Sequence, residues 1–177
     1  ALSIQEDVDE ATQALFDEAA QAEAESPERG VEAWRKVAQR QRKLRTPKRH
    51  LAKLYRELER WSQLADVLKD EKELVDDPIE KKAMLLEMVE LYREHLRLDV
   101  MVVNTLAELH KLDPEDASIL DEMLVQYESM SRWTDLISTL KKKAEVVIDA
   151  SEQVEIWTRI ATLFAERFSN QAEAIKA

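Results

Sequence analysis

Two stretches of this chain match in register when one is written above the other. They are LYRELERWSQLADVLKDEKELVDDPIEKKAMLLEMVELYREHL at Leu54–Leu96 and QYESMSRWTDLISTLKKKAEVVIDASEQVEIWTRIATLFAERF at Gln126–Phe168. An offset of 72 residues, with no gap, aligns Tyr55 with Tyr127, Arg60-Trp61 with Arg132-Trp133, and Tyr92 with Phe164. Because unrelated amphipathic segments would not keep one register over such a length, the chain contains an internal repeat.

The repeat divides into shorter units. The marker positions of the alignment fall at residues 20, 55, 92, 127 and 164, so the steps are alternately 35 and 37 residues long. A period of this length is typical of two helices and their connection. The sequence therefore predicts about five helical hairpins, the last of them incomplete.

The composition also favours helices. Gly30 is the only glycine, and the four prolines directly follow Ser26, Thr46, Asp77 and Asp113. Strand hairpins need glycine-rich turns, whereas a small polar residue followed by proline is a typical helix start. Together with the period of the apolar residues, these signals predict ten helices. The predicted ranges are 3–24, 27–44, 47–59, 61–75, 78–96, 98–112, 115–129, 132–148, 151–168 and 170–177.

Hairpins with this spacing resemble the tetratricopeptide repeat (TPR), whose pattern is W-x2-L-G-x2-Y, then A-x3-F, then P. The best match is Trp157, Ile160, Ala161 and Phe164. The resemblance covers nearly the whole chain, most clearly 47–177, with a degenerate first hairpin at 3–44. It implies an all-α fold, a right-handed α-solenoid of antiparallel hairpins that forms a single domain over 1–177. The chain is similar to long bacterial scaffolding arrays, and the short last helix suggests a fragment of one.

Residues that would support catalysis or a cofactor do not form a pattern. The absence of cysteine excludes thiol catalysis and thiolate metal sites. The three histidines, His50, His95 and His110, match no metal-binding spacing, and one glycine cannot form a phosphate loop. Trp61 and Trp133 share a repeat position, and we expect the tryptophans to pack in the core. We predict a protein without enzymatic activity, cofactor or metal.

The sequence gives limited information on location. No apolar run approaches the roughly 18 residues of a membrane span, so we expect no membrane insertion. The segment 1–10 is acidic and lacks the pattern of a signal peptide. A cytoplasmic location is favoured on this ground, although the compartment stays undetermined.

The distribution of charge is the most informative functional feature. The formal net charge is −11, with −9 in residues 1–34 and −12 after residue 56. Between them lie ten basic residues and no acid: Arg35, Lys36, Arg40, Arg42, Lys43, Arg45, Lys48, Arg49, Lys53 and Arg56. Three interpretations stay open. The acids Asp17, Glu18, Glu23 and Glu25 neutralise this block internally, or it binds an acidic protein, or it binds nucleic acid, which the net charge opposes.

The resemblance implies which residues line a binding groove. In this family the first helix of each hairpin lines the concave side. Carried over to this chain, and joined to the basic block, the predicted partner-binding residues are Arg45, Lys48, Arg49, Lys53, Arg56, Glu90, Arg93, Glu94, Asp121 and Glu128. We therefore predict a scaffold that binds an acidic peptide or protein. The alternatives are RNA or DNA binding through residues 35–56 and homotypic stacking of array ends.

Overall fold

The computed structural model describes residues 6 and 8–168, which form two compact units within residues 1–97 and 98–177. The first unit contains α1 (Glu10–Glu25), α2 (Pro27–Arg40), α3 (Thr46–Glu57), α4 (Trp61–Lys72), α5 (Pro78–Glu90) and the π-helical segment η1 (Leu91–Leu96). The second contains α6 (Asp99–Leu112), α7 (Ala117–Ser129), α8 (Trp133–Val146), α9 (Ala150–Leu163) and the π-helical segment η2 (Phe164–Phe168).

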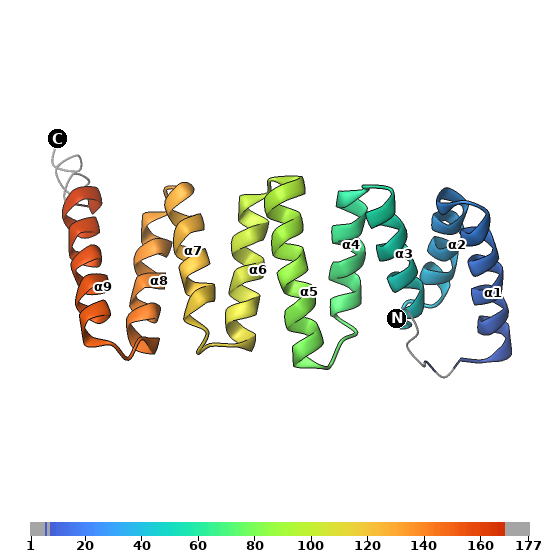
Figure 1. Cartoon of the computed structure of the whole chain (residues 1–177), viewed down its shortest axis with the longest axis horizontal. Helices are drawn as coiled ribbons and strands as arrows, with labels where there is room; N and C mark the ends of the chain where they lie inside the picture. Colours follow the sequence, from blue (N-terminus) through green and yellow to red (C-terminus); the bar gives the residue numbers. More distant parts are fainter. Residues whose placement is uncertain (1–5, 7, 169–177) are drawn as a thin grey trace. The chain divides into compact units, whose positions relative to one another are not determined.

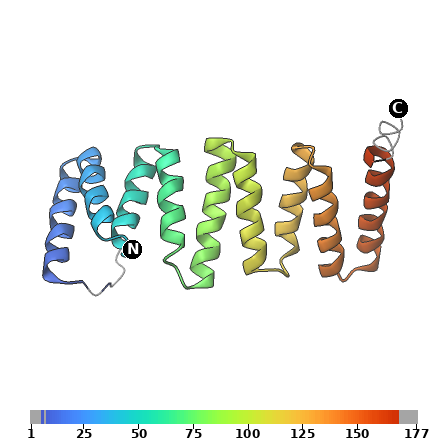
Figure 2. The same ribbon diagram turned by 180° about the vertical axis from the view of Figure 1, so that it is seen from behind.

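Within each unit, every helix packs on the next one along the chain. In the first unit α1 packs on α2, α2 on α3, α3 on α4, and α4 on α5 and η1. In the second unit α6 packs on α7, α7 on α8, and α8 on α9. Neighbours within a unit run antiparallel (Figures 1 and 2). The predicted all-α class and its architecture of antiparallel hairpins, of the TPR-like α-solenoid type, are confirmed. The predicted helix at 170–177 lies outside the described residues.

The turn between the two helices of a hairpin has the same geometry in both copies of the repeat. Glu59 has φ 53°, and its counterpart Ser131 has φ 56°. The Arg60 amide donates to the Tyr55 carbonyl oxygen at 2.8 Å, and the Arg132 amide donates to that of Tyr127 at 2.9 Å. This is the Schellman arrangement that closes a helix, with a non-glycine residue in the left-handed position. The repeat found in the sequence is therefore also present in the backbone structure.

Several predicted helix ends are wrong by a few residues. The first helix begins at Glu10, where Asp9 caps it by accepting from the Thr12 amide at 2.8 Å. The second ends at Arg40, four residues early. Asp116, not Asp113, caps α7, and the helix from 78 changes to π-helical geometry at Leu91. The two helix starts depend on which of several nearby acids accepts the hydrogen bond, and sequence spacing does not decide that.

The first hairpin depends on close contact between its helices. A Cβ added at Gly30 would lie 2.8 Å from the Glu23 Cα, so only glycine lets α2 approach α1 this closely. Trp34 is 1% exposed and packs on Phe16, with 5.7 Å between their ring centroids. The expectation that the tryptophans lie in the core is wrong for Trp157, whose residue surface is 52% exposed on α9.

Candidate functional site

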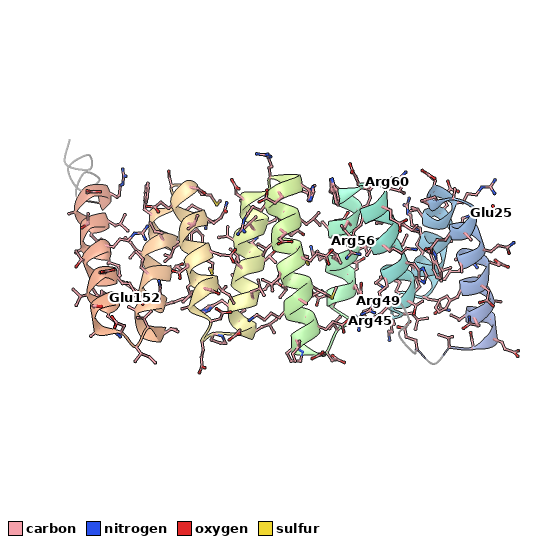
Figure 3. All side chains as sticks on the ribbon, viewed as in Figure 1. Glu25, Arg45, Arg49, Arg56, Arg60 and Glu152 are labelled. Carbon is pink, nitrogen blue, oxygen red and sulfur yellow. The ribbon has the colours of Figure 1, made fainter. Side chains whose placement is uncertain are left out.

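The basic residues at the start of α3 and along it are the centre of the predicted site. We call Arg45, Lys48, Arg49, Lys53 and Arg56 the α3 cations. Arg45, Arg49 and Arg56 follow one another along this helix (Figure 3). Their spacing of four and seven residues places them on one face of a helix, the geometry that a binding surface would need. What that face can bind depends on which charges already lie against it.

Two of these arginines belong to an ion cluster of Arg45, Arg49, Glu71 and Glu80. The Arg45 guanidinium donates to both Glu80 carboxylate oxygens, at 2.6 and 3.0 Å, and to Glu71 at 3.0 Å. Arg49 Nε donates to Glu71 at 3.1 Å, and the Arg49 guanidinium also pairs with Glu80. Only 5% of the Glu71 side chain is exposed. The hydrogen bond from Arg45 lowers the pKa of Glu80, against the opposing effect of burial. The cluster ties α3 to α4 and α5.

A second cluster ties α3 to the first hairpin. The Glu23 carboxylate of α1 accepts from Lys53 Nζ and from Trp34 Nε1, both at 2.7 Å, and lies 2.7 Å from His50 Nδ1. The His50 ring also stacks on Trp34, with 4.1 Å between centroids. Burial alone would raise the pKa of Glu23, but these hydrogen bonds and the His50 charge together lower it. We call Glu23, Trp34, His50 and Lys53 the Glu23 cluster.

The two remaining α3 cations also have partners. Arg56 donates to Glu87 of α5, with Nε 2.7 Å from the carboxylate oxygen. Lys48 is buried, and its ammonium donates to the carbonyl oxygens of Arg42 at 2.5 Å and Leu44 at 3.1 Å. Burial lowers the pKa of Lys48, although nearby acids oppose the shift. Each α3 cation thus has an internal partner.

The acids that neutralise α3 differ from those expected. Of the four expected acids of α1, only Glu23 forms an ion pair with the basic block among the described residues, while Glu18 and Glu25 line a hollow together with Lys36 and Arg40 of α2. Asp17 accepts from Gln13, and Glu25 pairs with Arg29. The other acids, Glu71, Glu80 and Glu87, come from α4 and α5. Glu6 adds a remote helix cap, accepting from the amides of Arg45 at 2.6 Å and Thr46 at 3.0 Å.

The predicted residues outside α3 do not gather into one described site. In the first unit, Glu90 and Glu94 are exposed and Arg93 is half-buried in η1. In the second unit, Asp121 pairs with Lys143 at 2.6 Å and Glu128 with Arg159 at 2.8 Å. On the predicted side of α3, a hollow of about 220 Å³ is lined by Arg49, Arg56, Glu71, Glu80 and Glu87, among others. Its charged groups are largely paired with one another.

The other half of the basic block has a different environment. Arg35, Lys36, Arg40, Arg42 and Lys43 lie on α2 and on the turn after it, and we call them the α2 cations. All five are exposed, and among the described residues no ion pair engages any of them. The sequence contained a signal for this split, because Val31, Trp34 and Val37 mark the buried stripe of α2 and the cations fall outside it. We missed it by treating residues 35–56 as one block.

A groove of about 750 Å³ runs between α2 and α4, across α3. Arg35, Gln39 and Arg42 line its α2 side, and Gln63, Asp66, Asp70 and Glu73 line its α4 side. Leu51 and Tyr55 of α3 form its floor. The groove meets a different face of α3 from the hollow that Arg49 and Arg56 line, because its residues Lys48, Leu51 and Tyr55 are offset by one position, about 100° around the helix. We call it the α2–α4 groove.

Two further properties of the described part of the chain bear on its chemistry. Among residues 6 and 8–168, no three His, Asp or Glu side chains are grouped so that they could hold a metal ion. No described helix combines the length and the apolar character needed to cross a membrane.

Comparisons with known proteins give distant structural likenesses. The chain matches no protein-family model and no curated protein sequence. Two crystal structures of MamA are each 15% identical to it, with TM-scores of 0.48 and 0.44. They match over 94% and 98% of this chain and 87% and 91% of theirs. MamA 41-end from Desulfovibrio magneticus RS-1 is 12% identical over 95% of this chain and 92% of its own, with a TM-score of 0.40. Membership of the tetratricopeptide family stays a prediction.

Proposed function

We propose that this chain is a non-catalytic scaffold that binds an acidic segment of a partner protein, and that the α2 cations make the first contact. The observation that supports this is a set of five exposed cations that form no ion pair with any described residue, on one short stretch of a chain whose net charge is −11. A surface of one sign, left without internal partners, attracts a partner of the opposite sign and speeds its association.

The proposal shifts the contact site along the basic block. The α3 cations would join a complex only by giving up Glu23, Glu71, Glu80 or Glu87, and breaking such contacts costs free energy. The α2 cations need no such exchange. The groove-lining set carried over from the family therefore becomes a second contact region, reached after the α2 cations are engaged.

Nucleic acid is the alternative ligand of the same cations. Phosphate binding gains from every basic residue that can release counterions, so internal pairing of the α3 cations weakens this alternative. The acidic wall of the α2–α4 groove, beside Arg35 and Arg42, would also repel a phosphate backbone. An acidic protein segment carries fewer charges and can avoid that wall.

The test compares two labelled probes at about 0.15 M salt, where exposed charges more than about 8 Å apart are largely screened from each other. One is a helical peptide with Glu at every polar position, and the other is a single-stranded oligonucleotide of equal charge. We expect the peptide to bind and the double variant Arg40→Glu with Lys43→Glu to bind it at least about tenfold more weakly.

The matched control is Lys141→Glu with Lys142→Glu, an equal charge change at two exposed lysines of α8. It should change peptide binding by less than about threefold, since these lysines are not expected to contact the peptide. Absence of peptide binding, or equal weakening by both double variants, would contradict the proposal. Tighter binding of the oligonucleotide with a steep salt dependence would favour the nucleic-acid alternative.

A further inference from the structure

The walls of the α2–α4 groove carry opposite charge. Arg35 and Arg42 lie on one side, and Asp66, Asp70 and Glu73 on the other. Arg35, Arg42, Asp66 and Asp70 are exposed, and none of them forms an ion pair with another described residue. The two rows have opposite sign and form no ion pair with each other, which leaves both rows available to a third group.

Charged residues of both walls affect the pKa of Tyr55 on the floor of the groove. Burial raises the pKa of its hydroxyl; Arg35 and Arg60, at the start of α4, lower it, and Asp66 raises it further. Arg35 and Asp66 thus act on the same floor residue from opposite sides. On the α4 side, Asp70 likewise acts on the ammonium of Lys48, which also lines the groove. A ligand on the floor would therefore lie between the two rows of charge.

The sign of the walls restricts what can occupy the groove. A ligand of one sign is attracted by one wall and repelled by the other, so neither a polyacid nor a polycation gains on both sides. An apolar ligand would cover Leu51 and Tyr55 but would remove four charges from water without pairing them, which is costly. A ligand that makes favourable contacts with both walls and with the floor has an apolar face, an acidic edge and a basic edge.

The spacing of the wall residues indicates the conformation of that occupant. Asp66 and Asp70 are four residues apart on α4, about 6 Å along the helix axis, and Gln63 to Glu73 spans about 15 Å. Side chains four residues apart on a facing helix repeat at the same distance. The helix diameter of about 10 Å lets opposite edges of one helix reach the two walls while a third face meets the floor.

We infer that the α2–α4 groove binds an amphipathic helix of a partner protein, with acidic residues along the edge that faces Arg35 and Arg42 and basic residues along the edge that faces Asp66 and Asp70. The inference rests on the proposed function, because it names the segment that the scaffold would bind. The partner's helix would lie against a face of α3 other than the one that carries the predicted groove residues Arg49 and Arg56.

The experiment uses the chain and a displayed library of helical peptides of about 20 residues, long enough to form a helix. The apolar positions are fixed as Leu, and the positions along both edges are randomised among Glu, Lys and Gln. We expect the enriched peptides to carry Glu on one edge and Lys on the other. Peptides with one sign on both edges should be depleted.

Wall variants test where an enriched peptide binds. Reversing one wall, by Arg35→Glu with Arg42→Glu or by Asp66→Lys with Asp70→Lys, should weaken binding about tenfold or more. Reversing both walls together should restore it, because the peptide can then bind in the opposite direction. The control, Lys141→Glu with Lys142→Glu, reverses two exposed lysines of α8 that do not line this groove and should change binding less than about threefold.

Several outcomes would overturn the inference. Suppose that the enriched peptides are acidic on both edges and that reversal of Asp66 and Asp70 does not affect their binding. That result would agree with the proposed function but contradict the inferred helix with one acidic and one basic edge. Failure of the doubly reversed chain to restore binding would exclude pairing with both walls. No enrichment at all would show that the groove is not a docking site, while the acidic-probe titration tests the proposed function separately.

Discussion

The two halves of the basic block carry equal charge and behave differently. The five α3 cations have internal partners on α1, on α4 and α5, or, for Lys48, among the carbonyl oxygens of the preceding turn. The five α2 cations, next to them in the sequence, are exposed and form no ion pair among the described residues. Both helices pack between two neighbours, so the difference arises from the face that the cations occupy: on α2 the buried stripe is Val31, Trp34 and Val37, and the cations lie outside it.

This comparison separates two uses of positive charge. Charges buried between helices contribute to which helices pack together, and removing one partner leaves the other unpaired in a poorly hydrated place. Exposed charges contribute little to folding and remain available for binding. We therefore expect substitutions on α3 to change stability, and substitutions on α2 to change binding.

The largest expected effect is at Arg45. Arg45→Met keeps the aliphatic stem but removes the guanidinium, leaving Glu80 with one partner and Glu71, only 5% exposed, with Arg49 alone. We expect the free energy of unfolding, measured by urea denaturation, to fall by about 3 kcal/mol. Arg42→Met, three residues earlier and exposed, is the control and should change it by less than about 0.5 kcal/mol. Equal losses would mean that the two halves of the block do not differ.

The next effect is at Glu23, on the other side of α3. Glu23→Gln removes the negative charge that faces Lys53 and His50 and leaves a single acceptor oxygen for three donors. Because hydrogen bonds to a charged group contribute about 1.5–3 kcal/mol, we expect a loss of about 2 kcal/mol in the same measurement. Glu32→Gln, at an exposed position of α2, should be nearly neutral. A neutral result for Glu23→Gln would mean that α1 is held by its apolar contacts alone.

The sequence was sufficient for the architecture because the repeat is a property of many residues at once. The offset of 72 residues predicted equivalent turns, and Glu59 and Ser131 have nearly the same backbone conformation. It also related Leu91 to Leu163, and each lies within one residue of the point where an α-helix changes to π-helical geometry. Errors in single residues do not disturb a pattern of this length.

The repeat pattern does not separate the α2 cations from the α3 cations, because ion pairs join residues that are distant in the sequence. Arg45 finds Glu71 and Glu80, which lie 26 and 35 residues further along. Glu6, which caps the start of α3, lies 39 residues before Arg45. Local spacing shows which face of a helix a charge occupies, but not which distant acid the fold brings to that face. The spacing of Val31, Trp34 and Val37 does predict the buried stripe of α2, and therefore predicts that the α2 cations lie outside it.

The third effect is a dependence of stability on pH. The folded chain lowers the pKa of Glu23 and of Glu80 below the ordinary value of 4.5. A carboxylate with a lowered pKa contributes stability that is fully present above its unfolded pKa and is lost as the pH falls through its folded pKa. We expect the free energy of unfolding to be level above about pH 5 and to decline below about pH 4.5.

Urea titrations between about pH 3 and pH 7 measure this dependence. Glu80→Gln should make the decline shallower, because one of the carboxylates whose pKa is lowered, a group that also includes Glu6, Asp9 and Asp149, no longer gains a proton on unfolding. Arg42→Met should keep the full decline, since neither Glu23 nor Glu80 lies against Arg42. A decline of the same steepness in Glu80→Gln would mean that other acids determine the acid limit of the fold.

The smallest expected effect on stability concerns the α2 cations themselves. Lys36→Gln, Arg40→Gln and Lys43→Gln together remove three exposed charges that form no ion pair among the described residues. The free energy of unfolding should change by less than about 0.5 kcal/mol per substitution, whereas binding of the acidic peptide should weaken at least about tenfold. Removing the same number of charges from α3, by Arg49→Gln, Lys53→Gln and Arg56→Gln, should lower stability severely. A triple α2 variant that unfolds easily would show that these cations stabilise the fold, and their exposure would then no longer be an argument for a partner.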